Sequence, residues 1–211
     1  MTNKINEQCS SCRGVGAKLF LKGEKCNGPK CGIVRRNFPS GQHGVKKKRA
    51  KHSGYGRQLI EKQKAKKVYG ILERQFTKYA KEAVSKTGDT SKFLLGYLES
   101  RLDNVVYRMG LGASRRASRQ IVSHGHIIVN DRKVDVPSFR VRVGDVVSVG
   151  EISKKKIVFD KIEEKIAKKN DIPGWMAVDA KKLSAKVLNT PIVDNCSFDV
   201  KSIIEFYSKK I

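Results

Sequence analysis

Apolar residues recur every three or four positions between residues 57 and 109, and this spacing predicts helices. The first stripe covers residues 57–86, and Gly70 divides it into two consecutive helices. A second stripe starts at Asp89-Thr-Ser, whose side chains suit the start of a helix, and runs through residues 93–109. Gly110 ends this helix. Both stripes are expected to face a core.

The hydrophobic period changes farther along the chain. Ser114 can cap a short helix that ends at Gly125, a residue suited to a left-handed C-terminal position. Alternating apolar residues then predict short strands, with tight turns at Asn130-Asp131 and Gly144-Asp145. The stretch 154–182 is predicted to form a lysine-rich helix followed by an irregular segment. Together these elements predict an α+β fold.

The charge balance of the chain narrows its possible partners. Lys and Arg number 45 against 20 Asp and Glu, a formal net charge of +25, and residues 1–60 carry 14 basic residues against 2 acidic ones. Such a charge repels itself unless an acidic partner neutralises it, and nucleic acid and anionic membrane surfaces are the two candidates. Because 39% of the residues are hydrophobic, the chain is expected to fold rather than to remain a basic tail.

The hydropathy of the chain bears on its location. No apolar run approaches the ~20 residues of a membrane span. The first seven residues contain neither an apolar signal core nor an arginine-rich amphipathic pattern. We therefore expect a cytoplasmic protein, which either a bacterial or an organellar genome could encode.

Four of the five cysteines have metal-ligand spacing. Two residues separate Cys9 from Cys12, thirteen follow before Cys26, and four more before Cys31. Two close pairs joined by such a loop are typical of a zinc ribbon or knuckle, in which each turn presents two thiolates to one ion. One structural zinc per chain is the prediction, and an iron–sulfur cluster is an alternative. Two disulfides and reduced thiols without a metal are further alternatives, of which disulfides fit a cytoplasmic protein poorly. Cys196 is expected to be a buried structural thiol.

A dense basic segment follows the cysteines. Glycines at 41, 44, 54 and 56 exclude a long helix here. Gly41 and Gly44 permit close approach of the backbone to a phosphate, so RNA contact is favoured over a solvated face or a flexible tail. The candidate RNA-binding residues of this segment are Arg35, Arg36, Gln42, His43, Lys46, Lys47, Lys48 and Arg49.

The short helix after Ser114 carries a second basic surface. Its arginines share one face, and Ile121 and Val122 lie on the opposite, buried face. Forked guanidinium groups suit phosphate oxygens, and short loops can enter an RNA groove or junction. The alternative is a helix whose exposed face is basic without binding RNA. The candidate RNA-binding residues of this surface are Arg115, Arg116, Arg119, His124, Gly125 and His126.

Residues 98–149 resemble the RNA-binding module named after small-subunit ribosomal protein four, above all in LESRLDNVVYRMG and SRRASRQIVSHGHIIVN. The likeness extends along the chain in family order. It includes the cysteine spacing, GQHG at 41–44, EKQKAKKVYGILERQF at 61–76 and IEFYS at 204–208. The chain is therefore similar to the bacterial-type small-subunit ribosomal protein four family, in its four-cysteine, zinc-knuckle form.

The resemblance implies both an architecture and a function. It implies a four-cysteine metal knuckle and basic loop at 1–45, a helical domain at 46–97 to which residues 196–211 return, and an inserted RNA-binding module with a helical and loop extension at 98–195. It also implies primary binding of 16S rRNA in the 30S subunit, nucleation of subunit assembly and a contribution to translational accuracy. Small-subunit ribosomal proteins five and three would be neighbours, and Lys46–Arg49 would face mRNA in the channel through which it enters the ribosome.

Two other functional classes share some of these features. Ser100-Arg-Leu-Asp103 resembles a catalytic motif of pseudouridine synthases, whose large catalytic domain is not found in these 211 residues. Asp103 is therefore expected to make a local ion pair with a neighbouring arginine, and no enzymatic activity is predicted. The short hairpin module fits single-stranded or junction RNA better than DNA. Membrane binding would require exposed bulky apolar residues, and the basic block at 46–51 has none.

Overall fold

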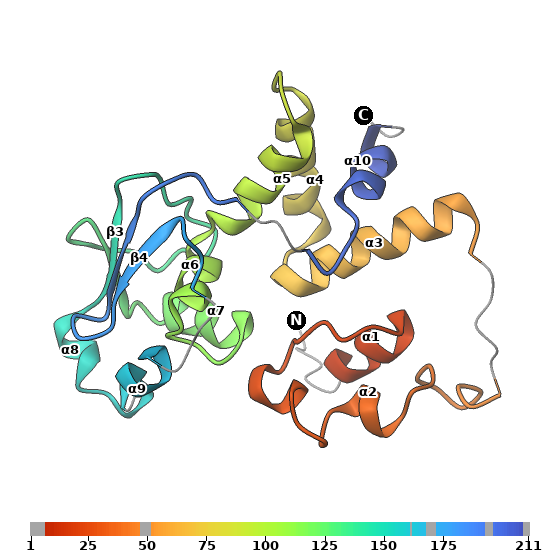
Figure 1. Ribbon diagram of the computed structural model, residues 1–211, viewed down its shortest axis with the longest axis horizontal. Helices are drawn as coiled ribbons and strands as arrows, with labels where there is room; N and C mark the ends of the chain where they lie inside the picture. The colour runs from red at the N-terminus through yellow and green to blue at the C-terminus, as the bar shows by residue number, and fades with distance from the viewer. Residues whose placement is uncertain (1–6, 47–51, 161, 168–171, 193–195, 209–211) are drawn as a thin grey trace. The chain divides into compact units, whose positions relative to one another are not determined.

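The computed structural model describes residues 7–46, 52–160, 162–167, 172–192 and 196–208 (Figure 1). The chain divides into two compact units, and each is described by itself. Unit 1 comprises Met1–Ser91 and Asn195–Ile211, and unit 2 comprises Lys92–Asp194. None of the helices in the described ranges has the length and hydropathy needed to span a lipid bilayer.

Unit 1 begins with short helical elements around the cysteines. These are α1 (Glu7–Val15), the 3₁₀ helix η1 (Gly23–Cys26) and α2 (Gly32–Arg35). α1 and α2 pack against each other, and Leu19 and Ile33 are buried beside the thiols. A small apolar centre therefore accompanies the cysteine cluster.

Three longer helices complete unit 1. α3 (Gly54–Tyr69) starts after Ser53, whose Oγ accepts a backbone hydrogen bond at 3.2 Å. It ends at Gly70, which adopts a left-handed conformation with φ of 64°. α4 (Glu73–Val84) follows, so the predicted division at Gly70 is confirmed. α10 (Val200–Ser208) packs against both α3 and α4, which brings the last described residues back to the first helices.

Unit 2 combines helices with one antiparallel sheet in the order β2-β1-β3-β5-β4. Its strands are β1 (Ile127–Val129), β2 (Arg132–Lys133), β3 (Val146–Val149), β4 (Met176–Asp179) and β5 (Ser184–Val187). Its helices are α5 (Thr90–Glu99), α6 (Leu102–Met109), α7 (Arg115–Ser123), α8 (Glu151–Lys154), η2 (Ile157–Phe159) and α9 (Ile162–Ala167). The predicted mixture of helices with a small antiparallel sheet is confirmed.

The β1–β2 hairpin turns at Asn130 and Asp131, whose φ angles are both positive at 46° and 63°. Two left-handed residues form the tight turn that matches the twist of a hairpin, and Asn and Asp tolerate this conformation better than most residues. The Asn130 side chain also donates to Asp145 at 2.8 Å and accepts from the Val146 amide at 2.9 Å. The predicted turn is confirmed, and its side chain ties the hairpin to β3.

The prediction of a single helix over residues 93–109 is wrong, because the structure has two helices in this range. α5 ends at Glu99 and α6 starts at Leu102, with Arg101 in an extended conformation between them. The Leu102 amide donates to the carbonyl of Phe139 at 2.8 Å instead of continuing the helical ladder. A tertiary backbone partner therefore satisfies the groups freed at the break.

The lysine-rich stretch 154–182 also differs from its prediction. Within its described residues it forms η2 and α9 in place of one helix, and it then enters β4. β4 and β5 pair with each other, with Met176 opposite Val187, and neither strand was predicted. Trp175, which directly precedes β4, is buried in the core of unit 2.

Candidate RNA-binding interface

α7 is fixed in place by contacts at its start and along one side. Ser114 caps the helix by accepting a backbone hydrogen bond at 3.3 Å. Gly112 lies so close to Ser118 that a Cβ at position 112 would be 2.2 Å from the Ser118 Oγ. The apolar side buries Ile121 and Val122 in the core, and the helix packs against α6. The arginines therefore occupy the remaining side of a helix that is capped at its start and packed along its apolar side.

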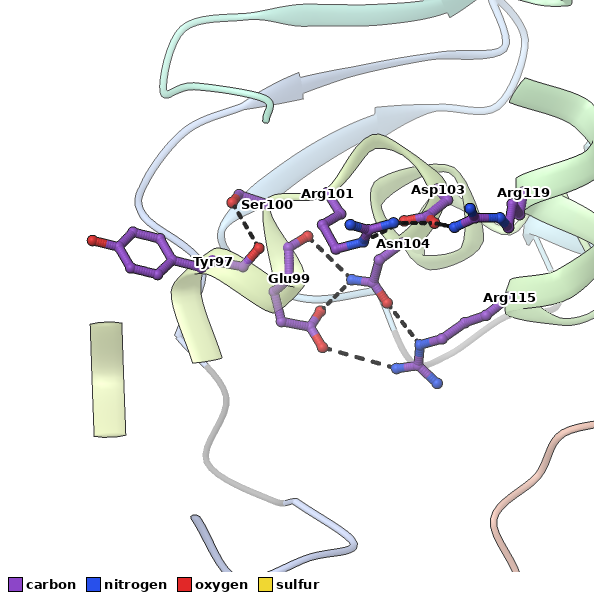
Figure 2. Close-up of polar contacts among 8 residues, drawn as sticks. All are labelled: Tyr97, Glu99, Ser100, Arg101, Asp103, Asn104, Arg115 and Arg119. Atoms are coloured by element: carbon purple, nitrogen blue, oxygen red, sulfur yellow. Dashed lines mark hydrogen bonds and ion pairs between the residues drawn. The ribbon is translucent and has the colours of Figure 1, made fainter. Parts of the chain in front are cut away.

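The three arginines of α7 differ in exposure. Arg116 is exposed, 46% of the Arg119 side chain is exposed, and only 20% of the Arg115 side chain is exposed. Figure 2 shows the guanidinium groups of Arg115 and Arg119 directed toward residues 99–104. The helical spacing predicted that the three arginines share one exposed basic face. In the structure each of them differs from the others in its exposure to solvent.

Glu99, at the end of α5, is fully buried and forms the first anchor beneath α7. Arg108 donates from Nε and Nη2 to its two carboxylate oxygens at 2.9 Å each, and Asn104 donates to it at 2.7 Å. Arg115 donates from Nε to Asn104 Oδ1 at 2.7 Å, and its Nη2 lies 3.8 Å from Glu99 Oε1. The Arg115 guanidinium also stacks over the Tyr107 ring at 4.6 Å.

Asp103, in the first turn of α6, forms the second anchor. Arg101 binds both of its oxygens, from Nε at 3.1 Å and from Nη2 at 2.8 Å. Arg119 adds a hydrogen bond from Nη1 to Asp103 Oδ2 at 3.0 Å (Figure 2). The predicted local ion pair of Asp103 is therefore confirmed. Buried charges are stable only when paired in this way.

The residues after α7 are not equally accessible. His124 is exposed, and Gly125 has a left-handed φ of 68°. His126 is buried, and its Nδ1 lies 3.0 Å from the Ser153 Oγ. Burial lowers the pKa of His126, and the nearby charge of Lys156 lowers it further. His126 therefore supports this edge from inside instead of facing a ligand.

The basic loop of unit 1 is held by contacts that the sequence pattern did not reveal. Arg13 donates to the carbonyls of Phe38 and Pro39 at 2.8 and 3.1 Å and stacks on the Phe38 ring. A Cβ at Gly44 would lie 2.0 Å from the Pro39 carbonyl oxygen, and Gly41 has a φ of 113°. The exposed candidates on and before this loop are Arg35, Arg36, Gln42, His43 and Lys46. The candidates Lys47, Lys48 and Arg49 lie outside the described residues.

The four predicted metal ligands line one small cavity between α1, η1 and α2. They are reduced, and a Cβ at Gly32 would lie 2.9 Å from that of Cys9, so only glycine leaves room for this thiol. The Lys22 amide donates to Cys26 Sγ at 3.3 Å. Burial raises the pKa of Cys12, and the other three thiols raise it further. A backbone hydrogen bond from Leu19 acts in the opposite direction and lowers this pKa. As placed, however, no three Cys, His, Asp or Glu side chains in the described part of the chain are arranged to hold a metal ion.

Comparisons with known proteins connect both units to one family. Residues 3–99 match the family described as ribosomal protein S4/S9 N-terminal domain, and residues 100–147 match the S4 domain. The small ribosomal subunit protein uS4 of Acetivibrio thermocellus is 48% identical over 211 residues, which cover 99% of this chain and 100% of that protein. The uS4 proteins of Caldicellulosiruptor bescii and Thermus thermophilus are 47% and 45% identical, with the same coverage.

The chain belongs to the uS4 family. This is a family of small-subunit ribosomal proteins and not of enzymes, so the predicted ribosomal function and the predicted lack of catalysis are confirmed by membership. The S4 domain covers α6, α7 and the β1–β2 hairpin, which include the α7 arginines and Asp103, whereas Glu99 is the last residue of the N-terminal match. Family membership alone assigns no role to any one of these side chains, and their geometry is what distinguishes them.

Proposed function

We propose that this chain is a primary 16S rRNA-binding protein that nucleates assembly of the 30S subunit, with α7 as part of its rRNA-binding surface. One observation carries the proposal: Arg116 and Arg119 are exposed on a helix whose opposite side is packed in the core of unit 2. Guanidinium groups bind phosphate oxygens in a fixed fork geometry, and the net charge of +25 favours a polyanion. His124 and Gly125 extend this surface beyond the helix.

The exposed loop of unit 1 supports a second proposed RNA surface. Arg35, Arg36, Gln42 and His43 are exposed on or before a loop that Arg13 fixes, which suits contact with a phosphate backbone. We assign Lys46 and the following Lys47, Lys48 and Arg49 to mRNA where it enters the ribosome. Contacts with small-subunit ribosomal proteins five and three, and a contribution to translational accuracy, belong to the same proposal and rest on the family resemblance.

A structural zinc at Cys9, Cys12, Cys26 and Cys31 is the proposed cofactor, one per chain. Four reduced thiols around one cavity, with a backbone amide already donating to Cys26, form a suitable donor set. When bound, the ion would hold the two cysteine pairs together and stabilise the short elements that carry the basic loop. Four protein ligands leave no open position, so no catalytic role is assigned to it.

Elemental analysis of the purified chain tests the cofactor. The expected content is about one zinc per chain. It falls in the Cys12→Ser variant and stays unchanged in the matched Cys196→Ser variant, whose thiol lies outside the cavity. Iron in place of zinc, or zinc that is retained after Cys12→Ser, would contradict the assignment.

Sedimentation of a cell extract containing the tagged full chain tests the ribosomal proposal. The chain is expected to migrate with the small subunit and, after purification, to retain a 5′-domain fragment of 16S rRNA in the presence of excess transfer RNA. Migration at the top of the gradient, or equal loss of the fragment to the competitor, would overturn the proposal.

A further inference from the structure

The two buried carboxylates of unit 2 are each shared between a local arginine and an arginine of α7. Asp103 binds Arg101 along its own segment and Arg119 across to α7. Glu99 binds Arg108 through both oxygens and reaches Arg115 mainly through the amide of Asn104. Each carboxylate therefore connects its own segment to α7, and Figure 2 shows the contacts of Arg119 with Asp103 and of Arg115 with Asn104 and Glu99.

Electrostatic attraction alone does not account for acids in this position. A carboxylate beneath a basic face reduces the positive potential that a polyanion meets, so it weakens non-specific binding. Such a carboxylate instead fixes the orientation of the arginine side chain that it binds. An unrestrained arginine loses rotamer freedom when it binds a phosphate, and an arginine that is already held loses less.

The degree of burial separates the roles of the α7 arginines. Asp103 engages one of the three guanidinium nitrogens of Arg119, and 46% of this side chain stays exposed. Arg115 is turned inward onto Asn104 and Tyr107, with 20% of its side chain exposed. Arg116 is exposed and has no partner among the residues the structure describes. The three therefore range from a fully anchored side chain to an unrestrained one.

We infer that Asp103 and Glu99 are positioning residues for RNA recognition, an inference that rests on the proposed rRNA-binding function of α7. Asp103 orients Arg119 so that its exposed nitrogens meet a phosphate of structured rRNA. Glu99 and Asn104 make Arg115 a tether of α7 instead of a phosphate ligand. Arg116 supplies charge without a fixed direction and contributes to binding of any RNA.

A double-mutant cycle on the full chain tests this inference. Dissociation constants are measured for a 5′-domain fragment of 16S rRNA and for poly(U) of equal length, using the wild type, Asp103→Asn, Arg119→Ala and the double variant. Asp103→Asn raises the net charge by one and yet is expected to weaken binding to the rRNA fragment about tenfold, as when one charge-assisted contact is misplaced. Binding to poly(U) is expected to stay the same or to tighten. In the Arg119→Ala background the further effect of Asp103→Asn on the rRNA fragment disappears.

Asp135→Asn is the matched control, because it removes an exposed aspartate of the same unit. It is expected to leave the preference for the rRNA fragment over poly(U) unchanged. The inference is wrong if Asp103→Asn, like this control, leaves the preference for the rRNA fragment unchanged. It is also wrong if Asp103→Asn weakens binding of the rRNA fragment by the same factor with and without Arg119. If instead Arg119→Ala and Arg116→Ala both leave binding of the rRNA fragment unchanged, the proposed function of α7 fails.

A measurement on the unaltered chain covers the case in which Asp103→Asn unfolds. Nitrogen-15 NMR of the arginine side chains reports rotation of each guanidinium and exchange of its protons with water. Arg115 and Arg119 are expected to show restricted rotation and slow exchange in the free protein, and Arg116 fast exchange. Equal behaviour of the three residues would overturn the inference without any substitution.

Discussion

Each unit contains a cluster of basic side chains around carboxylates. In unit 1 the carboxylate is the exposed partner, whereas in unit 2 the exposed partner is a basic side chain. In unit 1, Glu73 accepts hydrogen bonds from Lys62 and Lys66 at 2.7 Å each and from the Tyr207 hydroxyl at 2.9 Å. Its side chain is 45% exposed, while Lys62 is buried. In unit 2 the carboxylates of Glu99 and Asp103 are buried, and a cation reaches solvent.

This difference indicates what each cluster does. Lys62 lies over the ring of Phe206 at 4.5 Å as well as against Glu73, so its charge is used inside the unit to join α3, α4 and α10. Arg119 is held by a buried acid and remains accessible to a ligand. A buried cation paired with an exposed acid stabilises helix packing, whereas an exposed cation paired with a buried acid presents an oriented charge.

Glu99→Gln should have the largest effect on stability. It leaves the guanidinium groups of Arg108 and Arg115 without their buried countercharge, a loss of about 3–5 kcal/mol. Trp175 is the only tryptophan of the chain and is buried in unit 2, so its fluorescence during urea unfolding reports this unit. Glu151→Gln, at an exposed ion pair of the same unit, should cost less than about 0.5 kcal/mol. Equal losses in the two variants would show that the buried cluster is not structural.

Arg115→Ala should destabilise unit 2 by about 1–3 kcal/mol, because it leaves the Asn104 acceptor and the Glu99 carboxylate short of a partner. Arg116→Ala is the control on the neighbouring position of the same helix and should change stability by less than about 0.5 kcal/mol. The same Trp175 unfolding curves measure both variants. A larger loss from Arg116→Ala would contradict the assignment of Arg115 as the tether.

Glu73→Gln should have a smaller effect that depends on pH. Partial burial opposes ionisation of Glu73, but hydrogen bonds from Lys62, Lys66 and Tyr207 prevail and lower its pKa from 4.5 to about 2. Because the folded pKa is depressed, the stabilisation is present above pH 4.5 and is lost as the pH falls to about 2. Screening at this half-exposed site limits its value to about 1 kcal/mol.

Hydrogen exchange of the α10 amides, followed by mass spectrometry, measures the effect of Glu73→Gln. The variant should exchange faster than the wild type at pH 7, and the difference should vanish near pH 2. Trp175 fluorescence should not change, because the substitution lies in the other unit. A difference that persists unchanged at low pH would show that packing, and not the ionised carboxylate, is responsible.

The features that were predicted correctly depend on local chemistry. Gly70 ends α3 because it adopts a left-handed φ, and Asn130-Asp131 forms a turn for the same reason. Ser114 caps α7 with its own hydroxyl. Each of these signals acts within a few residues, so periodicity and residue type were sufficient.

The features that were missed depend on partners distant in sequence. The break after Glu99 requires the carbonyl of Phe139, and the inward turn of Arg115 requires acceptors on α5 and α6. Helical spacing placed the α7 arginines on one face but could not distinguish a buried tether from an exposed ligand. His126 likewise is buried because Ser153 and Phe159 pack against it.

The salt dependence of rRNA binding is the decisive test of α7 as an RNA-binding surface. The affinity of the wild type and of the Arg116→Ala/Arg119→Ala double variant for a 5′-domain fragment of 16S rRNA is measured across a series of potassium chloride concentrations. The slope of log affinity against log salt should be shallower in the double variant by about 2, one for each lost phosphate contact. Identical slopes in the two proteins would show that α7 does not contact the rRNA backbone.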